Sequence, residues 1–143
     1  MKRKIFMTMF LSLLIISGCS RMETDVQFAR RVFNSLCNGN RSVQNSIDWE
    51  NFKAMNQDVG KAYSSIVNEK DRADYRKMFF YNLAYTFRAS GGKTSIFVNW
   101  RVLSQDANNL IIGTDSSVNG KTLKITLSFN NGKRKIAGID WQQ

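Results

Sequence analysis

The sequence has no histidine and no proline, and it has only two cysteines among its 143 residues. Histidine is the commonest general base in enzymes and the commonest metal ligand, so its absence removes both. A Ser-His-Asp or Cys-His catalytic arrangement is therefore excluded. The absence of proline also excludes a proline-rich tether. We therefore expect a protein that is not an enzyme and that holds no metal and no cofactor.

A short apolar run near the start of the chain predicts export. Three basic residues at positions 2–4 precede a stretch from Ile5 to Ile16 that only two hydroxyl side chains interrupt. A membrane-spanning helix needs about 20 apolar residues, so this run is too short to cross a bilayer. A cationic start, a short apolar stretch and small residues at its end are typical of a secretory signal peptide. We expect residues 1–18 to be one.

The end of this stretch resembles the lipobox of bacterial lipoproteins. Its residues are Ile16-Ser17-Gly18-Cys19, and the usual form of the motif is Leu-Ala/Ser-Gly-Cys. The resemblance implies that Cys19 becomes the first residue of the mature chain and carries fatty acyl chains such as palmitate. Each buried methylene contributes about 0.8 kcal/mol, so two or more chains hold a protein stably on a bilayer.

Charge and location restrict the partners of the mature chain. The leader contains three of the 21 basic residues and none of the 11 acidic ones, which leaves a net charge of +7 on the remainder. Ser20 after the cysteine favours, by the sorting rule of enteric bacteria, an outer-membrane anchor facing the periplasm, with residues 19–23 as a lipidated tether; the inner membrane is the alternative. A basic domain there attracts anionic headgroups, cell-wall polymers or acidic proteins. We expect an envelope protein or a phospholipid as partner and no nucleic acid.

The second cysteine cannot form a disulfide within the chain. Once Cys19 carries lipid, Cys37 has no remaining thiol to pair with. Cys37 lies on the apolar stripe of a predicted helix, where a free cysteine usually behaves as a small buried apolar residue. Disulfide pairing with a second chain is the alternative that the sequence leaves open.

The first half of the mature chain is predicted to be helical. The segment 24–27, Thr-Asp-Val-Gln, forms a capping box at the start of a first helix, which ends near residues 38–40. The apolar spacing from Phe52 to Ile66 predicts a second helix with Asp48 as N-cap, and Gly60 should bend or break it.

A third helix is expected after Asn68, which can cap it. Its later part, from Met78 to Phe87, places apolar side chains around the whole circumference. A helix that is apolar on every side is buried on more than one side. We therefore expect this helix to lie between the sheet and another helix, or to line a cavity.

Four strands follow, at residues 96–103, 110–118, 123–129 and 136–141. The short turns between them predict an antiparallel meander. The Asn-Gly pair at 119–120 is typical of a two-residue type I′ turn. The expected fold class is α+β: a single domain, residues 24–143, with about three N-terminal helices packed on one face of a four-stranded antiparallel meander sheet.

The order of elements resembles the nuclear transport factor 2-like, or cystatin-like, cone, in which a curved antiparallel sheet wraps around helices. Within that superfamily it is most similar to the periplasmic phospholipid-carrier proteins of the Mla lipid-transport pathway. The segments behind the resemblance are 47–52, 75–87, 122–129 and 136–141. The resemblance implies a lipid pocket between the third helix and the sheet. The carriers are usually soluble and longer than this chain.

A surplus of aromatic residues suggests which side chains such a pocket would use. If the sheet is concave, the candidates are Trp49, Phe79, Leu83, Phe87, Val98, Trp100 and Ile125. Ligand pockets are mostly apolar in this way, although the same residues could simply fill the core. Two functions follow: a membrane-anchored, non-enzymatic binding or scaffolding module for another envelope component, or a carrier of a phospholipid or other apolar ligand. The volume of any cavity between the third helix and the sheet should separate them.

Overall fold

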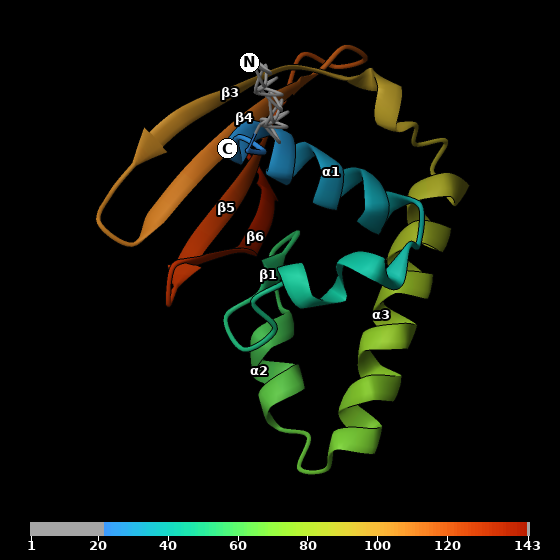
Figure 1. Ribbon diagram of the computed structural model, residues 1–143. Helices are drawn as coiled ribbons and strands as arrows, with labels where there is room; N and C mark the ends of the chain where they lie inside the picture. The colour runs from blue at the N-terminus through green and yellow to red at the C-terminus, as the bar shows by residue number, and fades with distance from the viewer. Residues whose placement is uncertain (1–21, 143) are drawn as a thin grey trace, which may run out of the picture.

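The computed structural model describes residues 22–142 of the chain. The expected signal peptide, the lipidated cysteine and the start of the tether lie outside the described residues. Within them the architecture is α+β, as predicted, with helices packed against a six-stranded mixed sheet (Figure 1). Among residues 22–142, no helix has the length and apolar character needed to cross a membrane.

The first helix, α1 (Asp25–Cys37), begins at the predicted capping box. The backbone N–H of Gln27 donates to the hydroxyl of Thr24 at 3.2 Å, and the backbone N–H of Thr24 donates to the side-chain oxygen of Gln27 at 2.9 Å. The backbone N–H groups of Thr24 and Gln27, which have no partner inside the helix, are thereby satisfied. The buried face of α1 consists of Phe28, Ala29, Val32, Phe33, Leu36 and Cys37.

The predicted second helix is wrong over most of its length. In its place lie a 3-10 helix, η1 (Arg41–Ser46), a hairpin of two short strands, β1 (Lys53–Ala54) and β2 (Gln57–Asp58), and a short helix, α2 (Val59–Ser64). The apolar spacing fits a helix, but β1 pairs with a distant strand of the sheet instead. This long-range pairing outweighs the local periodicity.

The residues at the predicted start of that helix have other roles. Asp48 caps no helix: its carboxylate accepts hydrogen bonds from the side-chain amide of Asn51 at 3.1 Å and from the hydroxyl of Ser128 at 2.9 Å. Asp58 caps α2, because its carboxylate accepts from the backbone N–H of Lys61 at 2.9 Å. Asp48 thus connects the loop before β1 to the sheet.

The longest helix, α3 (Glu69–Ala89), follows the predicted cap. The side-chain oxygen of Asn68 accepts from the backbone N–H of Asp71 at 2.8 Å. A short 3-10 helix, η2 (Thr94–Ile96), then leads into the sheet.

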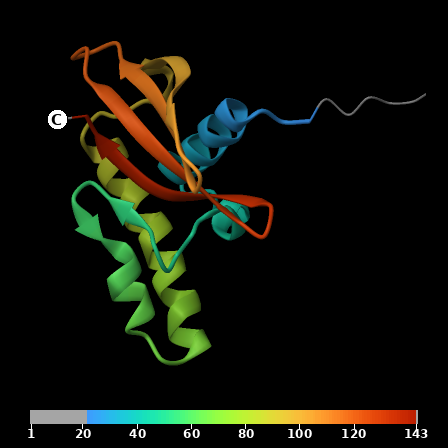
Figure 2. The ribbon, with the colours of Figure 1, turned by 90° about the vertical axis from the view of Figure 1, so that its left-hand side faces the viewer.

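The expectation that α3 is buried on several sides is wrong, whereas the alternative, that it lines a cavity, agrees with the structure. Phe80 and Ala84 on its inner face are 1% exposed, whereas Met78, Tyr81 and Tyr85 on its outer face are 50%, 61% and 62% exposed. Figure 1 shows α3 along one border of the molecule, and in the view of Figure 2 it lies behind the other elements. Its all-round apolar character therefore leaves an aromatic surface uncovered.

The sheet contains the predicted meander and two further strands. Its four long strands are β3 (Phe97–Gln105), β4 (Asn109–Ser116), β5 (Thr122–Asn130) and β6 (Lys133–Trp141). The order in the sheet is β2-β1-β6-β5-β4-β3, and β1 runs parallel to β6. The predicted four-stranded antiparallel sheet is thus corrected to a six-stranded mixed one. Two-residue strands carry no alternation that a sequence pattern could reveal.

The turns of the sheet also differ from the prediction. The β4–β5 connection spans residues 117–121, and Gly120 takes a positive φ of 69° while Asn119 does not. The expected two-residue type I′ turn is therefore wrong at this place. Two successive positive φ angles occur instead in the β1–β2 turn, at Met55 (48°) and Asn56 (64°), which is the type I′ pattern.

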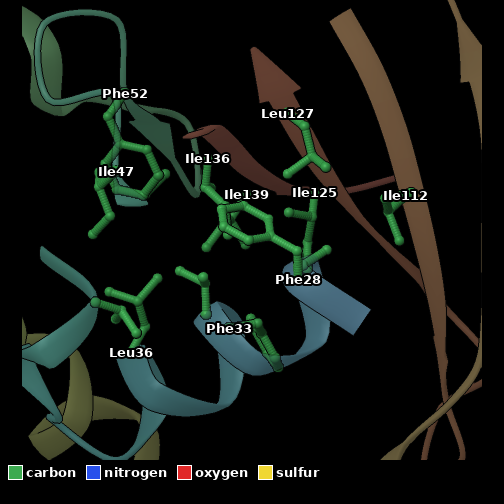
Figure 3. Close-up of a cluster of buried hydrophobic side chains, with 14 of the residues drawn as sticks. Phe28, Phe33, Leu36, Ile47, Phe52, Ile112, Ile125, Leu127, Ile136 and Ile139 are labelled. Atoms are coloured by element: carbon green, nitrogen blue, oxygen red, sulfur yellow. The ribbon is translucent and has the colours of Figure 1, made fainter. Parts of the chain in front are cut away.

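One apolar core joins α1 to the sheet (Figure 3). The inner face of β5 presents Leu123, Ile125 and Leu127, which are all fully buried. They pack in one cluster with Ile112 of β4 and Ile136 of β6. Each such side chain contributes roughly 1.5–3 kcal/mol when it is fully buried.

Candidate functional site

An apolar groove of about 390 Å³ separates α3 from the β1–β2 hairpin. Its apolar wall includes Met55, Val59, Met78, Phe79 and Leu83. Its polar side chains are uncharged, namely Gln57, Asn82 and Thr86, with Tyr75 at the same wall. Among residues 22–142, no ionisable acid or base other than this tyrosine lines the groove. The volume lies within the range of ligand sites, roughly 300–1,000 Å³.

A smaller cavity of about 90 Å³ lies behind the groove, between α1, α3 and the sheet. Its wall exposes apolar atoms, and four residues line both spaces: Ala54, Met55, Phe79 and Leu83. The cavity, the inner cavity of this site, therefore adjoins the inner wall of the groove. An apolar cavity of about 150 Å³ holds one benzene molecule. The inner cavity can accept the tip of an apolar side chain, but it is too small for an acyl chain.

Met55 stands where the groove meets the cavity. Its φ of 48° lies in the left-handed region, which costs an ordinary residue about 1–2 kcal/mol. Asparagine and glycine are the usual residues at such a turn. The strain is maintained because the backbone N–H of Met55 donates to the carbonyl of Ile139 at 2.9 Å. A strained residue held at the mouth of a cavity is an indication of function.

Trp49 supports the groove from within the core. Its ring lies 5.6 Å from the ring of Tyr63, 5.5 Å from that of Phe79 and 6.1 Å from that of Phe80. Its indole N–H donates to the carbonyl of Gln44 at 2.9 Å. Edge-to-face and tilted aromatic pairs of this kind favour one arrangement of the rings. Trp49 therefore fixes the position of α3 relative to the loop before β1.

The seven residues predicted to line a pocket do not all meet. Phe79, Leu83 and Phe87 line the inner cavity. Ile125 is fully buried in the sheet, and Trp49 lies in the aromatic cluster of the core. The remaining two, Val98 and Trp100, line a separate crevice beside α1.

Sequence reasoning missed the wall of the groove that the hairpin supplies. Met55 and Val59 were assigned to a helical face, because the hairpin itself was not predicted. The signal that could have found them is the pair of methionines, Met55 and Met78, since methionine is common at adaptable binding surfaces.

An exposed apolar stripe continues the groove along α3. Met78 lines the groove and is half exposed. Tyr81 and Tyr85 follow it on the outer face, with their rings stacked at 6.3 Å and an interplanar angle of 12°. Tyrosine and methionine are enriched at protein interfaces. The groove and this stripe, defined as Met78, Tyr81 and Tyr85, form one surface.

Cys37 faces the inner cavity from α1. Its side chain is buried and its thiol is free. Burial raises the pKa of this thiol to about 12. A disulfide with a second chain would require α1 to leave the core. The structure therefore favours a free, buried thiol over the intermolecular pairing that the sequence left open.

We expect Cys37 to react slowly with a thiol reagent in the native protein. A rise in pKa from about 9 to about 12 lowers the thiolate fraction at about pH 8 on the order of 10³-fold, and the thiolate is the reactive form. Absorbance after addition of Ellman's reagent, with and without urea, measures the effect. A Val67→Cys variant supplies a fully exposed control thiol. Rapid modification of native Cys37 would contradict the burial.

Neither a metal-holding cluster among the described residues nor a known relative assigns a function to the groove. In the part of the chain from 22 to 142, no three acidic or thiol side chains gather to hold a metal ion. Comparison of the sequence with protein-family models, with curated proteins and with solved structures gave no match. The functional argument therefore rests on the geometry of the groove, the inner cavity and the exposed stripe.

Proposed function

We propose that this chain is a membrane-anchored lipoprotein of the bacterial envelope whose domain is a non-enzymatic binding module. The lipobox supports an anchor on Cys19, and Ser20 favours the outer membrane with the domain facing the periplasm. The partner is another envelope protein, an apolar segment of which lies in the groove between α3 and the β1–β2 hairpin.

The observation that carries this proposal is an open, uncharged groove that continues into an exposed aromatic stripe. A protein segment can place one apolar side chain in the inner cavity of about 90 Å³. Its backbone can bond to the polar side chains at the groove, Gln57, Asn82 and Thr86. The stripe on α3 then adds the aromatic contacts that often dominate binding energy at interfaces.

A phospholipid or another apolar ligand is the second candidate. The apolar cavity behind the groove and the resemblance to the cystatin-like cone of the lipid carriers support it. The small volume of that cavity favours a protein side chain, because two acyl chains would have to remain in the open groove. We therefore rank the envelope protein first.

Crosslinking in intact cells tests the protein partner. We expect a photoreactive amino acid at Gln57 or Thr86 to yield one discrete protein adduct. Met78→Asp should reduce that adduct by about tenfold or more, because it places a charge in the apolar contact. Val118→Asp, at a more exposed apolar residue in the β4–β5 turn, should leave the adduct unchanged.

Native mass spectrometry separates the two candidates. If the purified chain retains stoichiometric phospholipid and gives no protein adduct, the protein partner is refuted and the lipid carrier stands. An adduct that persists in Met78→Asp would show that the partner binds elsewhere on the domain.

A further inference from the structure

A second crevice, of about 500 Å³, lies between the first half of α1 and β3. Val26, Gln27 and Arg30 line it from α1, and Val98, Asn99 and Trp100 line it from β3. It shares no lining residue with the groove. Figure 1 shows the start of α1 beside β3, and both ribbon views place the α2–α3 connection at the opposite end of the molecule.

The crevice combines an unpaired cation with amphipathic and apolar groups. Arg31 forms an ion pair with Glu23 at 2.7 Å, but Arg30 has no carboxylate partner among the described residues. Trp100 is half-buried, and Val98 is exposed beside it. Arginine and tryptophan together are typical of residues at the headgroup level of a bilayer.

The start of α1 must lie close to any lipid carried by Cys19. Six peptide units separate Cys19 from Asp25, the first residue of the helix. A fully extended chain covers at most about 3.5 Å per residue, so the bilayer surface lies within about 20 Å of this point. Val26 and Gln27, in the first turn, already line the crevice. The crevice is thus within reach of the headgroups.

Further basic residues lie beside the start of α1. The guanidinium of Arg134 donates to the carboxylate of Asp25 at 2.8 Å and to the backbone carbonyl of Glu23 at 2.9 Å. These bonds hold the β5–β6 turn against the start of α1. Lys133 and Lys135 flank Arg134 in the sequence and add charge there. An anionic surface attracts basic residues that lie within a Debye length of it.

We propose that the crevice between α1 and β3 is the face by which the domain docks on the bilayer, with the phosphate of an anionic phospholipid against Arg30. This inference rests on the proposed lipid anchor at Cys19. Val98 and Trp100 lie at the level of the headgroups in the docked state. The α2–α3 connection then points away from the lipid, and the groove, which shares no lining residue with the crevice, stays accessible to the partner.

A fluorescent probe in the crevice tests the docking. The full-length lipidated protein is reconstituted in vesicles of phosphatidylcholine, with or without phosphatidylglycerol. Ser95→Cys carries an NBD label in the crevice, and Val67→Cys carries it at the opposite end; native Cys37 is buried and stays unlabelled. We expect a blue shift of the emission at position 95 that grows with phosphatidylglycerol, and no shift at position 67.

Charge variants complete the test. Arg30→Gln should weaken the docking about fivefold, the effect of one basic residue at an anionic surface. Lys70→Gln removes an exposed charge at the start of α3, near the α2–α3 connection and away from the crevice. This variant should leave the docking unchanged. If mass spectrometry finds lipid on Cys19 but position 95 shows no shift, the docking face is refuted and the anchored module stands. If Cys19 carries no lipid, both the proposed anchor and the proposed docking face are refuted.

Discussion

Phe80→Ala will lower the free energy of unfolding by about 3–5 kcal/mol, the cost of emptying a buried aromatic site. Phe80 is 1% exposed, and its ring lies 6.1 Å from that of Trp49 and 6.4 Å from that of Phe79. Tyr81→Ala, one position further along α3, will change the same quantity by less than about 1 kcal/mol, because Tyr81 is exposed and contacts mainly Tyr85. Urea denaturation followed by circular dichroism measures both values.

The pair of variants tests which face of α3 is free. The apolar sequence from Met78 to Phe87 predicts burial on every side, and under that prediction the two alanine variants would be equally destabilised. Equal losses would therefore contradict the exposed stripe, and with it the surface proposed for an envelope partner.

Gly60→Ala will destabilise the domain by about 1–3 kcal/mol, the usual cost of overpacking. A Cβ at this position would lie 2.3 Å from the carbonyl oxygen of Glu50 and 2.8 Å from its carbonyl carbon. The backbone N–H of Gly60 also donates to the carbonyl of Phe52 at 2.8 Å, so α2 cannot move away without losing this bond. The expected sign is opposite to that of helix propensity, which favours alanine over glycine by about 0.5–1 kcal/mol.

Lys61→Ala is the matched control for this variant. Lys61 is exposed in the same helix, and within residues 22–142 its side chain has no hydrogen bond or ion pair; the change should stay within about 0.5 kcal/mol. A stabilised Gly60→Ala variant would show that α2 does not press against the loop before β1. In that case Val59, the neighbouring residue, would not form a fixed wall of the groove.

Local signals predicted much of the fold. The capping box at Thr24 and the cap at Asn68 marked the beginnings of α1 and α3, since a cap involves residues only three positions apart. The alternation of Leu123, Ile125, Leu127 and Phe129 predicts the inner face of β5. The first three are fully buried, whereas Phe129, near the end of the strand, is 42% exposed, so the prediction is wrong there. Such patterns depend on the backbone geometry of one segment, so the sequence of that segment suffices to reveal them.

Long-range pairing explains the main error. Lys53 and Ala54 of β1 pair with Gly138 and Ile139 of β6, more than 80 positions away. No pattern within residues 48–66 reveals this partner, and the spacing of Phe52 and Tyr63 fits a helix as well as it fits the observed structure.

The candidate site also contains residues that a local pattern predicted and residues that only long-range pairing brings there. Phe79, Leu83 and Phe87 belong to one helical face, and the aromatic sequence of α3 already suggested them. Met55 and Val59 reach the groove because the hairpin crosses beside α3, and only the pairing of β1 with β6 places it there.

From the sequence alone follow the expectation of a lipidated leader, the basic charge, the absence of histidine and the α+β class. Only the tertiary structure decides which face of α3 is covered, that residues 53–58 form a hairpin, and that a small cavity adjoins a groove. The physical reason is that helix caps and strand alternation arise from bonds between near neighbours. Burial and sheet pairing arise from contacts between segments that are distant in the chain, and these contacts determine where the binding surface lies.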